Sequence, residues 1–405
     1  MPRHLLGNRD FSRALNRSAV LNMIKTHGPI SRAEVARRTG LSAATVTGIT
    51  AELIADGLVL EKAPGDSRGG RPPILLILNP HGGYVVGLKL TENETIGALT
   101  DLEATVMAKR TTRFTDPSPE RAVEALAQVV AALVTQSGMR KKQLLGVGVG
   151  LAGIVDGARG VLRQSPYFGW RDVPLRDMLQ ARMRVPVYID NDVNTLTLTE
   201  KWFGAGQGID DFLTVTVGRG IGLGIVVNGQ FYRGVRGGAG EFGHTVMEPD
   251  GPLCDCGKRG CLETFVGDPG LLRMAAEAVQ RGEMPGPVEG MENLIALAEE
   301  GNAGAQAVFA RAGEVLGRGV ANLINVFNPQ RIIIGGEGVR AGDWLFGPMR
   351  ASAARHVMPG LGDDTEIRID PWGDDAWARG AASLVLRELF ESPVHREPLM
   401  VEEPA

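Results

Sequence analysis

The most informative stretch of this 405-residue chain reads Glu241-Phe242-Gly243-His244 and, after nine further residues, Cys254-Asp255-Cys256-Gly257-Lys258-Arg259-Gly260-Cys261-Leu262-Glu263. It contains all three cysteines of the chain. One imidazole and three thiolates are a complete tetrahedral ligand set for a structural zinc ion, which leaves no position open for water. Three reduced cysteines in an ordinary loop are the alternative, but the spacing favours the metal. We therefore predict a structural zinc ion (Zn2+) with four ligands, His244, Cys254, Cys256 and Cys261.

The same stretch resembles the signature of a known protein family. Glu-x-Gly-His followed by Cys-x-Cys-Gly-x-x-Gly-Cys-x-Glu is similar to the motif of the ROK family, which holds bacterial repressors, open reading frames and sugar kinases. The resemblance implies that Glu241, His244 and Glu263 bind sugar hydroxyls, with the histidine using its other ring nitrogen for zinc. A neutral imidazole can serve both partners at once. The metal would then orient a ligand-binding side chain and the loop that carries Glu263.

The size and composition of the chain limit its class. A chain of 405 residues is too long for one ordinary domain, so two or three are expected. No run approaches the roughly 20 apolar residues that span a bilayer, and residues 1–6 lack the apolar segment of a secretory signal. Three cysteines, all assigned to the metal, indicate a reducing compartment rather than a disulfide framework. We therefore expect a cytoplasmic protein without a membrane partner.

The formal net charge of −4 hides an asymmetry between the two ends of the chain. Residues 1–73 contain 11 lysines and arginines against 6 aspartates and glutamates, a balance of +5 that leaves −9 for the remainder. A small basic segment on an acidic body predicts that any nucleic acid is bound by the N-terminal segment.

The first eighty residues have the pattern of a winged helix-turn-helix domain. A first helix is expected around residues 16–25, and a capping box at residues 31–34 opens a second helix, which Gly40 ends. A third helix, capped at its start, runs to about Ala55. In such a unit this last helix enters the major groove of DNA by its N-terminal end. The predicted DNA contacts on it are Ser42, Ala43, Ala44, Thr45 and Thr47.

A basic wing is expected to follow the helices. Residues 58–61 and 74–78 read as two strands of a hairpin, whose tip carries Arg68 and Arg71 among glycines and prolines. Arginines suit a narrow minor groove, where the negative potential is strongest. A three-helix core can also mediate protein contacts, and a loop arginine can simply be solvated. The order of helix, turn and wing, and the similarity of the Gly-Arg-Pro segment to the wing of ROK repressors, favour operator DNA as the partner.

The rest of the chain alternates strands and helices, as an α/β sheet does. Strands are expected between residues 84 and 110 and again between 212 and 233, where Asn228-Gly229 is a strong hairpin turn. These two groups resemble the duplicated, actin-like (ribonuclease H-like) fold of ROK proteins. We predict a winged domain at 1–80, a body of two α/β lobes at 83–390 with a zinc loop at 244–263, and a tail at 391–405. The resemblance implies a ligand cleft between the lobes.

A second polar motif lies at Asp190-Asn191-Asp192-Val193-Asn194, after a short expected strand at 187–189. A carboxylate at such a place can simply cap the N–H groups of the following helix. Asn191 and Asp192, however, match the sugar-binding pair of the ROK family, and we predict them as sugar contacts. Tyr167 takes the place of an asparagine that contacts the sugar in that family, so the identity of the sugar stays open.

The sequence also bears on phosphoryl transfer, which needs a backbone cradle and a metal ion for the phosphates. ROK kinases have a motif of the form Asp-x-Gly-Gly-Thr at the first strand turn, where this chain has residues 89–93, Lys-Leu-Thr-Glu-Asn. A second glycine-rich loop is retained at 218–224, with Arg219 in place of the usual threonine. We therefore predict that the chain is not an enzyme and has no catalytic residue. A zinc-containing ROK sugar kinase with a DNA-binding appendage is the alternative.

Together these motifs predict a DNA-binding regulator of carbohydrate metabolism, most often a repressor in this family. It would bind operator DNA as a homodimer or homotetramer, and a bound sugar would close the lobes and shift the DNA-binding domains off their half-sites. Linkage limits this effect to the preference of the sugar for one conformation, commonly about 1–3 kcal/mol. A vestigial pocket, in a body that only oligomerises or docks a partner protein, is a third reading; the cost of unsatisfied buried carboxylates argues against it.

Overall fold

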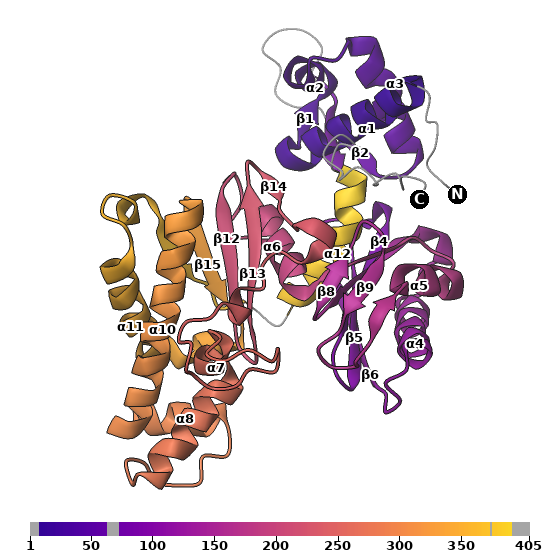
Figure 1. The fold of residues 1–405 in the computed structure, drawn as a ribbon. Helices are drawn as coiled ribbons and strands as arrows, with labels where there is room; N and C mark the ends of the chain where they lie inside the picture. Colours follow the sequence, from indigo (N-terminus) through magenta and orange to yellow (C-terminus); the bar gives the residue numbers. More distant parts are fainter. Residues whose placement is uncertain (1–7, 63–72, 373–374, 391–405) are drawn as a thin grey trace, which may run out of the picture. The chain divides into compact units, whose positions relative to one another are not determined.

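The computed structural model describes residues 8–62, 73–372 and 375–390. The chain divides into two compact units: unit 1 runs to Thr195 and resumes at Trp377, and unit 2 is Leu196–Ala376 (Figure 1). The predicted tail at 391–405 and the wing arginines Arg68 and Arg71 lie outside the described residues.

Unit 1 begins with the predicted winged helix-turn-helix, whose fold is confirmed. Its three-stranded sheet has the order β1-β3-β2. Its elements are α1 (Asn8–His27), β1 (Ile30–Ser31), α2 (Arg32–Thr39), α3 (Ala43–Ala55), β2 (Val59–Lys62) and β3 (Leu75–Leu78). As predicted, Ser31 caps α2 by accepting a hydrogen bond from the N–H of Glu34, and Gly40 ends that helix in the left-handed region (φ 71°). Buried apolar side chains such as Val35 and Leu53 join the three helices.

Helix α1 starts eight residues earlier than its apolar pattern predicts. The added turns carry Arg13, whose guanidinium binds Glu52 of α3, and the next turn carries Arg17, whose guanidinium lies 2.8 Å from Asp56 at the end of α3. These partners are 39 positions apart in the chain, and helical periodicity cannot register them.

Each unit contains a five-stranded sheet of the same topology. The order is β11-β7-β4-β5-β6 in unit 1 and β14-β13-β12-β15-β16 in unit 2. In both, the first three strands in sequence are antiparallel, and the fourth and fifth extend the sheet in parallel beyond the first. The strands of unit 1 are β4 (Tyr84–Leu90), β5 (Glu94–Thr100), β6 (Val106–Arg113), β7 (Leu144–Leu151) and β11 (Val187–Asn191). The strands of unit 2 are β12 (Phe212–Val217), β13 (Ile221–Val227), β14 (Gln230–Phe231), β15 (Arg331–Gly335) and β16 (Glu366–Ile369). This repetition confirms the duplicated α/β fold.

The remaining elements complete the two units. Unit 1 also has the small sheet β10-β9-β8. Its members and the further helices of unit 1 are β8 (Ile154–Asp156), β9 (Val161–Gln164), β10 (Arg171–Val173), α4 (Pro119–Ser137), α5 (Leu175–Met183) and α12 (Ala376–Phe390). Helix α6 (Asp192–Phe203) begins in unit 1 and continues into unit 2. The other helices of unit 2 are α7 (Glu263–Val266), α8 (Asp268–Gln280), α9 (Met291–Glu299), α10 (Ala303–Phe327) and α11 (Gly342–His356).

Alternating glycines let α12 lie directly on the sheet of unit 1. Gly87 of β4 and Gly148 of β7 are register partners on neighbouring strands. A Cβ atom at Gly148 would lie 1.8 Å from the carbonyl oxygen of Ala381, and one at Gly87 would lie 2.4 Å from that of Ala378. The alternate positions of these strands, such as Leu88 and Val149, belong to the buried cluster that includes α4. The sheet therefore has α12 on one face and the cluster of α4 and α5 on the other.

The substitution Gly148→Ala is expected to destabilise the protein, because the added methyl group has no room beneath α12. Overpacking of this kind costs typically about 1–3 kcal/mol, and more where backbone must move. Gly48→Ala in α3 is the matched contrast, since nothing lies within 4 Å of its added Cβ and alanine favours a helix by up to about 1 kcal/mol. Calorimetry should show unfolding at a lower temperature for the first variant only. Equal stability of Gly148→Ala and the parent protein would contradict the close approach.

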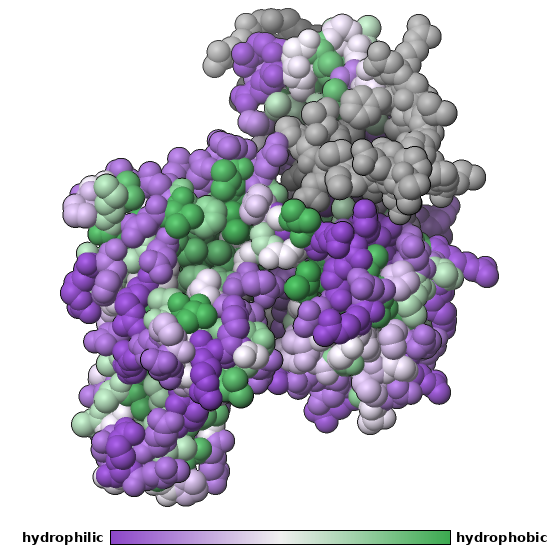
Figure 2. Space-filling view, in the orientation of Figure 1, coloured by the Kyte–Doolittle hydropathy of each residue, from purple (hydrophilic) through white to green (hydrophobic). Residues whose placement is uncertain are grey.

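Hydrophilic side chains dominate the face of the molecule drawn in Figure 2, with hydrophobic ones in small groups between them. The large apolar side chains that are most exposed, Val235 and Val326, lie on different elements. Scattered exposure of this kind is ordinary for a protein surface. Among the described helices, not one combines the length and apolar character that crossing a bilayer requires.

Candidate functional site

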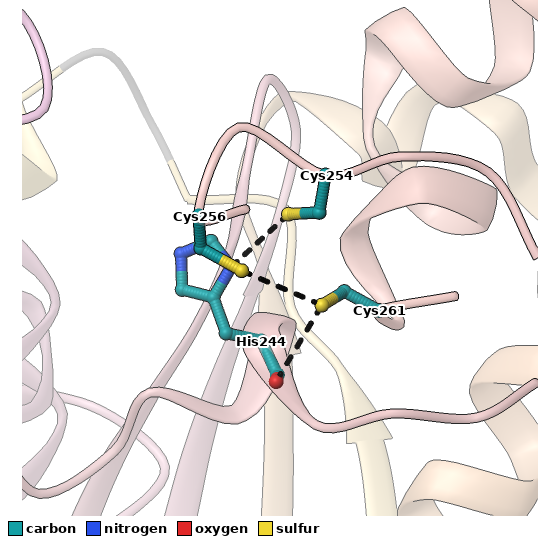
Figure 3. A group of neighbouring side chains, drawn as sticks. All are labelled: His244, Cys254, Cys256 and Cys261. Carbon is teal, nitrogen blue, oxygen red and sulfur yellow. Dashed lines mark hydrogen bonds between the residues drawn. The ribbon is translucent and has the colours of Figure 1, made fainter. Parts of the chain in front are cut away.

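The four predicted metal ligands lie together in unit 2, where the imidazole of His244 and three sulfur atoms converge (Figure 3). Their donor atoms all lie within 4.8 Å of one another. Nδ1 of His244 is 3.5 Å from Sγ of Cys254, and Sγ of Cys256 is 3.6 Å from Sγ of Cys261. Around a tetrahedral zinc ion with Zn–S bonds of about 2.3 Å, neighbouring sulfurs are about 3.8 Å apart. The donor set therefore fits a four-coordinate metal ion.

Contacts with α10 and one close backbone approach hold the loop that carries these ligands. A side chain at Gly260 (φ 67°) would lie 1.5 Å from the carbonyl oxygen of Glu248, so only glycine fits there. The carboxylate of Glu248 lies 2.8 Å from the guanidinium of Arg318 and also binds that of Arg311, both on α10. Nothing in the local sequence indicates this brace, because Glu248 and Arg318 are 70 positions apart.

The thiols differ in their acidity. Burial raises the pKa of Cys254 to about 12, and its side-chain hydrogen bonds with Cys256 and Cys261 act in the same direction. Burial also raises the pKa of Cys261. For Cys256 burial acts upward too, but hydrogen bonds, among them that from the backbone N–H of Lys258, outweigh it and lower the pKa. A metal ion binds thiolates, so its binding must displace protons from the two raised thiols.

His244 directs its two ring nitrogens toward different partners. Nδ1 faces Cys254, whereas Nε2 lies 3.9 Å from Oε2 of Glu241. A short 3-10 helix, Phe242–His244, sets this arrangement, and its Phe242 is buried in the core of unit 2. The side chains of His244 and Glu241 remain 31% and 47% exposed, so a ligand can reach both. One nitrogen can thus bind a metal while the other meets a ligand.

Glu263, the third predicted sugar contact, lies at the start of α7, two residues after the fully buried Cys261. Its Oε2 accepts a hydrogen bond of 3.0 Å from the backbone N–H of Ile221. The bond joins the cysteine loop to the glycine-rich loop at 218–224. Local sequence patterns do not indicate this bond, because its two partners are 42 positions apart.

Asn191 and Asp192 belong to unit 1, apart from the other predicted sugar contacts, which belong to unit 2. Strand β11 continues to Asn191, two residues beyond its predicted end, because Asp190 and Asn191 pair with Gly150 and Leu151 of β7. Helix α6 begins at Asp192. The pair therefore occupies the carboxyl end of a parallel strand, where α/β sheets place ligand-binding residues.

The three polar side chains at this strand end have different tasks. The buried carboxylate of Asp190 accepts hydrogen bonds from the N–H of Asn191 (2.8 Å) and from Nδ2 of Asn194 (2.9 Å). Asn191 donates through Nδ2 to the carbonyl oxygen of Gly153 (3.0 Å). Asp192 is half-buried, and its Oδ1 accepts from the N–H of Val193 (3.0 Å). Asp190 thus serves the fold, while Asp192 is partly exposed at the carboxyl end of the strand.

The predicted DNA-contacting residues of α3 lie on its first turns. Ser42 is the N-cap, and its hydroxyl accepts a hydrogen bond of 3.1 Å from the N–H of Thr45. Four of the five are exposed and Thr45 is half-buried, whereas Val46 among them is buried in the domain core. Small side chains on this end of the helix permit close approach to a nucleic acid.

The substitution Ala44→Glu is expected to weaken operator binding by about tenfold or more, because a like charge at an interface costs several kcal/mol. The variant should stay folded, since Ala44 is exposed and an acidic residue near a helix N-terminus is favourable. Ala51→Glu, which is also exposed but two turns further along α3, is the control and should retain most of the affinity. Fluorescence anisotropy on DNA selected by the parent protein measures both. Equal losses would argue against this end of α3 as the reading surface.

At the end of β4, where ROK kinases have a phosphate-binding motif, the chain makes a tight turn. The N–H and the hydroxyl of Thr91 donate to the carbonyl oxygen of Glu94, at 3.0 and 3.1 Å, and close it. The turn carries Glu92, whose negative charge opposes a phosphate.

Comparisons with known proteins agree with this architecture. Residues 85–388 match the ROK family model, and residues 10–69 match the MarR family model. The xylose repressor of Bacillus subtilis (strain 168) is 32% identical over 386 residues, which cover 95% of this chain and 98% of that protein. The DNA-binding transcriptional dual regulator NagC of Escherichia coli (strain K12) is 32% identical over 335 residues, 82% of each chain.

A solved structure extends the likeness to three dimensions. It is the crystal structure of a ROK family transcriptional regulator described as a homolog of the E. coli MLC protein, with a TM-score of 0.86 and 26% identity. It covers 94% of this chain and 97% of its own. The predictions of a repressor-like regulator and of a chain that is not an enzyme are confirmed by these relatives, each of which is named as a repressor or a transcriptional regulator. The chain therefore belongs to the ROK family, as a transcriptional regulator with an N-terminal winged helix domain.

Proposed function

We propose that this regulator is a zinc-containing repressor of carbohydrate metabolism whose operator affinity falls when a sugar binds. The observation that carries the proposal is the placement of His244, with Nδ1 among three cysteine sulfurs and Nε2 facing Glu241. A histidine placed in this way contacts a metal ion through one ring nitrogen and a ligand through the other. The sugar contacts that we propose are Asn191, Asp192, Glu241, His244 and Glu263.

Zinc is the ion that we propose for the four donors, because three thiolates and one imidazole are a common closed set for structural zinc. When bound, it would fix the orientation of the imidazole and of the loop that ends at Glu263. The residues of the chain then supply the recognition. Carboxylates accept hydrogen bonds from sugar hydroxyls, and the asparagine amide can both donate and accept.

The names of the relatives suggest where to look for the sugar. One is named for xylose, and a further relative, the N-acetylglucosamine repressor of Escherichia coli O157:H7, is 32% identical over 335 residues, 82% of each chain. Pentoses and amino sugars therefore come first among the effectors that we propose. Tyr167, which is 37% exposed, stands where the family has a sugar-binding asparagine. A panel of sugars therefore tests whether the sugar specificity of this chain differs from that of either relative.

We further propose that the repressor acts in the cytoplasm as a homodimer or homotetramer on paired half-sites, which suits a winged helix-turn-helix protein. The helix α3 contacts Ser42, Ala43, Ala44, Thr45 and Thr47, with the wing arginines Arg68 and Arg71, would hold the operator. The sugar favours the conformation whose domains fit the half-sites poorly. Its effect equals its preference between the two conformations.

The test is an anisotropy titration of labelled operator DNA with a panel of sugars that includes xylose, glucose, N-acetylglucosamine and their acyclic polyols. We expect one cyclic sugar to weaken operator binding by about 5- to 150-fold, the range of typical coupling energies. The same sugars with ATP and magnesium should yield no ADP. Operator affinity unchanged by every sugar, or ADP formed with any of them, would overturn the proposal.

A further inference from the structure

The glycine-rich loop at 218–224, which comprises the turn at 218–220 after β12 and the first four residues of β13, has the composition of a phosphate-binding loop. Loops of this kind cradle phosphate oxygens with backbone N–H groups. In unit 2, two of these groups already have partners. The N–H of Ile221 donates to Glu263, and the N–H of Gly222 donates to the hydroxyl of Thr216, each at 3.0 Å. Two N–H groups of the loop are therefore already hydrogen-bonded to acceptors within the chain.

Glu337 presents a further oxygen to the same loop. It follows β15, which is the parallel neighbour of β12. Its Oε2 lies only 2.6 Å from the position that a Cβ atom on Gly218 would occupy, so the carboxylate rests directly on the first residue of the loop.

Two glycines fix the position of this carboxylate. A Cβ atom at Gly336 (φ 101°) would lie 2.4 Å from the carbonyl oxygen of Val217, and one at Gly338 would lie 2.6 Å from the side chain of Val217. The segment on both sides of Glu337 is therefore held against the end of β12. This restrained backbone limits how far the side chain of Glu337 can move away from Gly218.

A second carboxylate makes the loop unfavourable for anions. Asp268, at the start of α8, donates its N–H to the carbonyl oxygen of Gly218 at 2.9 Å. Burial raises the pKa of Asp268, and the negative charge of Glu337 raises it further. The nearby Arg340 is engaged, with Nη1 2.7 Å from Glu292 and Nε donating to the backbone oxygen of Glu337 at 2.9 Å. An incoming phosphate would meet two carboxylates on the loop that ought to hold it.

We propose that Glu337 fills the phosphate position of the 218–224 loop with its own carboxylate and so excludes nucleotides from unit 2. A regulator built in this way reports on its effector independently of the ATP concentration of the cell. The residue acts by occupying the loop. A purely structural role, as an acidic residue in the first turn of the short 3-10 helix Glu337–Ala341, would leave nucleotide affinity unaffected by its removal.

The test is a calorimetric titration of the full-length protein with the non-hydrolysable ATP analogue AMPPNP in the presence of magnesium. The parent protein should bind more weakly than about 1 mM. Glu337→Gly, which removes the carboxylate and its stem, should bind at least about tenfold more tightly. Glu337→Gln keeps the bulk without the charge and should fall between the two. Glu299→Gln is the control, since it removes an exposed acidic charge at the end of α9 in the same unit and leaves the pair of Arg340 and Glu292 intact.

Three results would overturn the proposal. One is tight AMPPNP binding by the parent protein. Another is no gain in Glu337→Gly, provided that its thermal unfolding and operator binding match those of the parent. The last is an equal gain in Glu299→Gln, which would assign the effect to net charge rather than to the position of Glu337.

Discussion

Replacing Cys261 with serine is expected to remove the metal ion and, with it, the response to sugar, while operator binding persists. Cys261 is fully buried and is one of four donors in a closed set. Outer-shell substitutions already weaken metal binding by roughly 10–100-fold, and the loss of a direct thiolate ligand should exceed that. The imidazole of His244 and the start of α7 at Glu263 then lose their common anchor. The winged helix-turn-helix does not contribute to the donor set, so its fold is retained.

Metal analysis of the purified protein measures the first effect, and sugar titration measures the second. Asp255→Asn is the matched control, because Asp255 is exposed and lies between Cys254 and Cys256 without belonging to the donor set. It should retain one equivalent of zinc and a normal sugar response. Full zinc occupancy in Cys261→Ser, or a sugar response that survives the loss of the metal, would show that the centre is not coupled to the ligand.

Asp192→Asn should produce a repressor that needs a higher sugar concentration to release its operator. A hydrogen bond to a charged group is worth about 1.5–3 kcal/mol, so the sugar should bind about 10- to 150-fold more weakly. The fold should survive, because the Oδ1 atom of asparagine can still accept the bond from the N–H of Val193. Operator affinity without sugar should equal that of the parent protein.

Calorimetric sugar titrations and operator binding on the same preparations separate these effects. Asp177→Asn on α5 is the control, since it also neutralises an aspartate of unit 1 but lies exposed on a helix outside the predicted site. Unchanged sugar affinity in Asp192→Asn would remove Asp192 from the site. Weakened operator binding in the absence of sugar would indicate instead that the residue supports the fold.

The sequence was most informative where the controlling interactions are local. The four metal donors lie within 18 residues, and the structure gathers their side chains as predicted. Helix α4 runs from Pro119 to Ser137, and both its apolar face and the Gly138 that ends it are encoded locally. The same holds for the caps of α2 and α3 at Ser31 and Ser42.

Contacts between distant residues account for what the sequence did not indicate. Strand β11 gains Asp190 and Asn191 only through pairing with β7. The bond from Ile221 to Glu263 and the contact of Glu337 with Gly218 each join segments that lie tens of residues apart. Periodicity and local motifs identify the glycines at such places, but they do not identify the distant side chains that contact those glycines.

We propose that a metal-bound His244 allows the ROK body to bind a sugar and thereby lower the affinity of the protein for operator DNA. This proposal is tested by comparing operator dissociation constants, with and without saturating sugar, for zinc-loaded and chelator-treated protein. In the zinc-loaded protein, sugar should weaken operator binding by about 5- to 150-fold. In the metal-free protein, sugar should leave operator binding unchanged. A sugar effect of equal size in both preparations would contradict it.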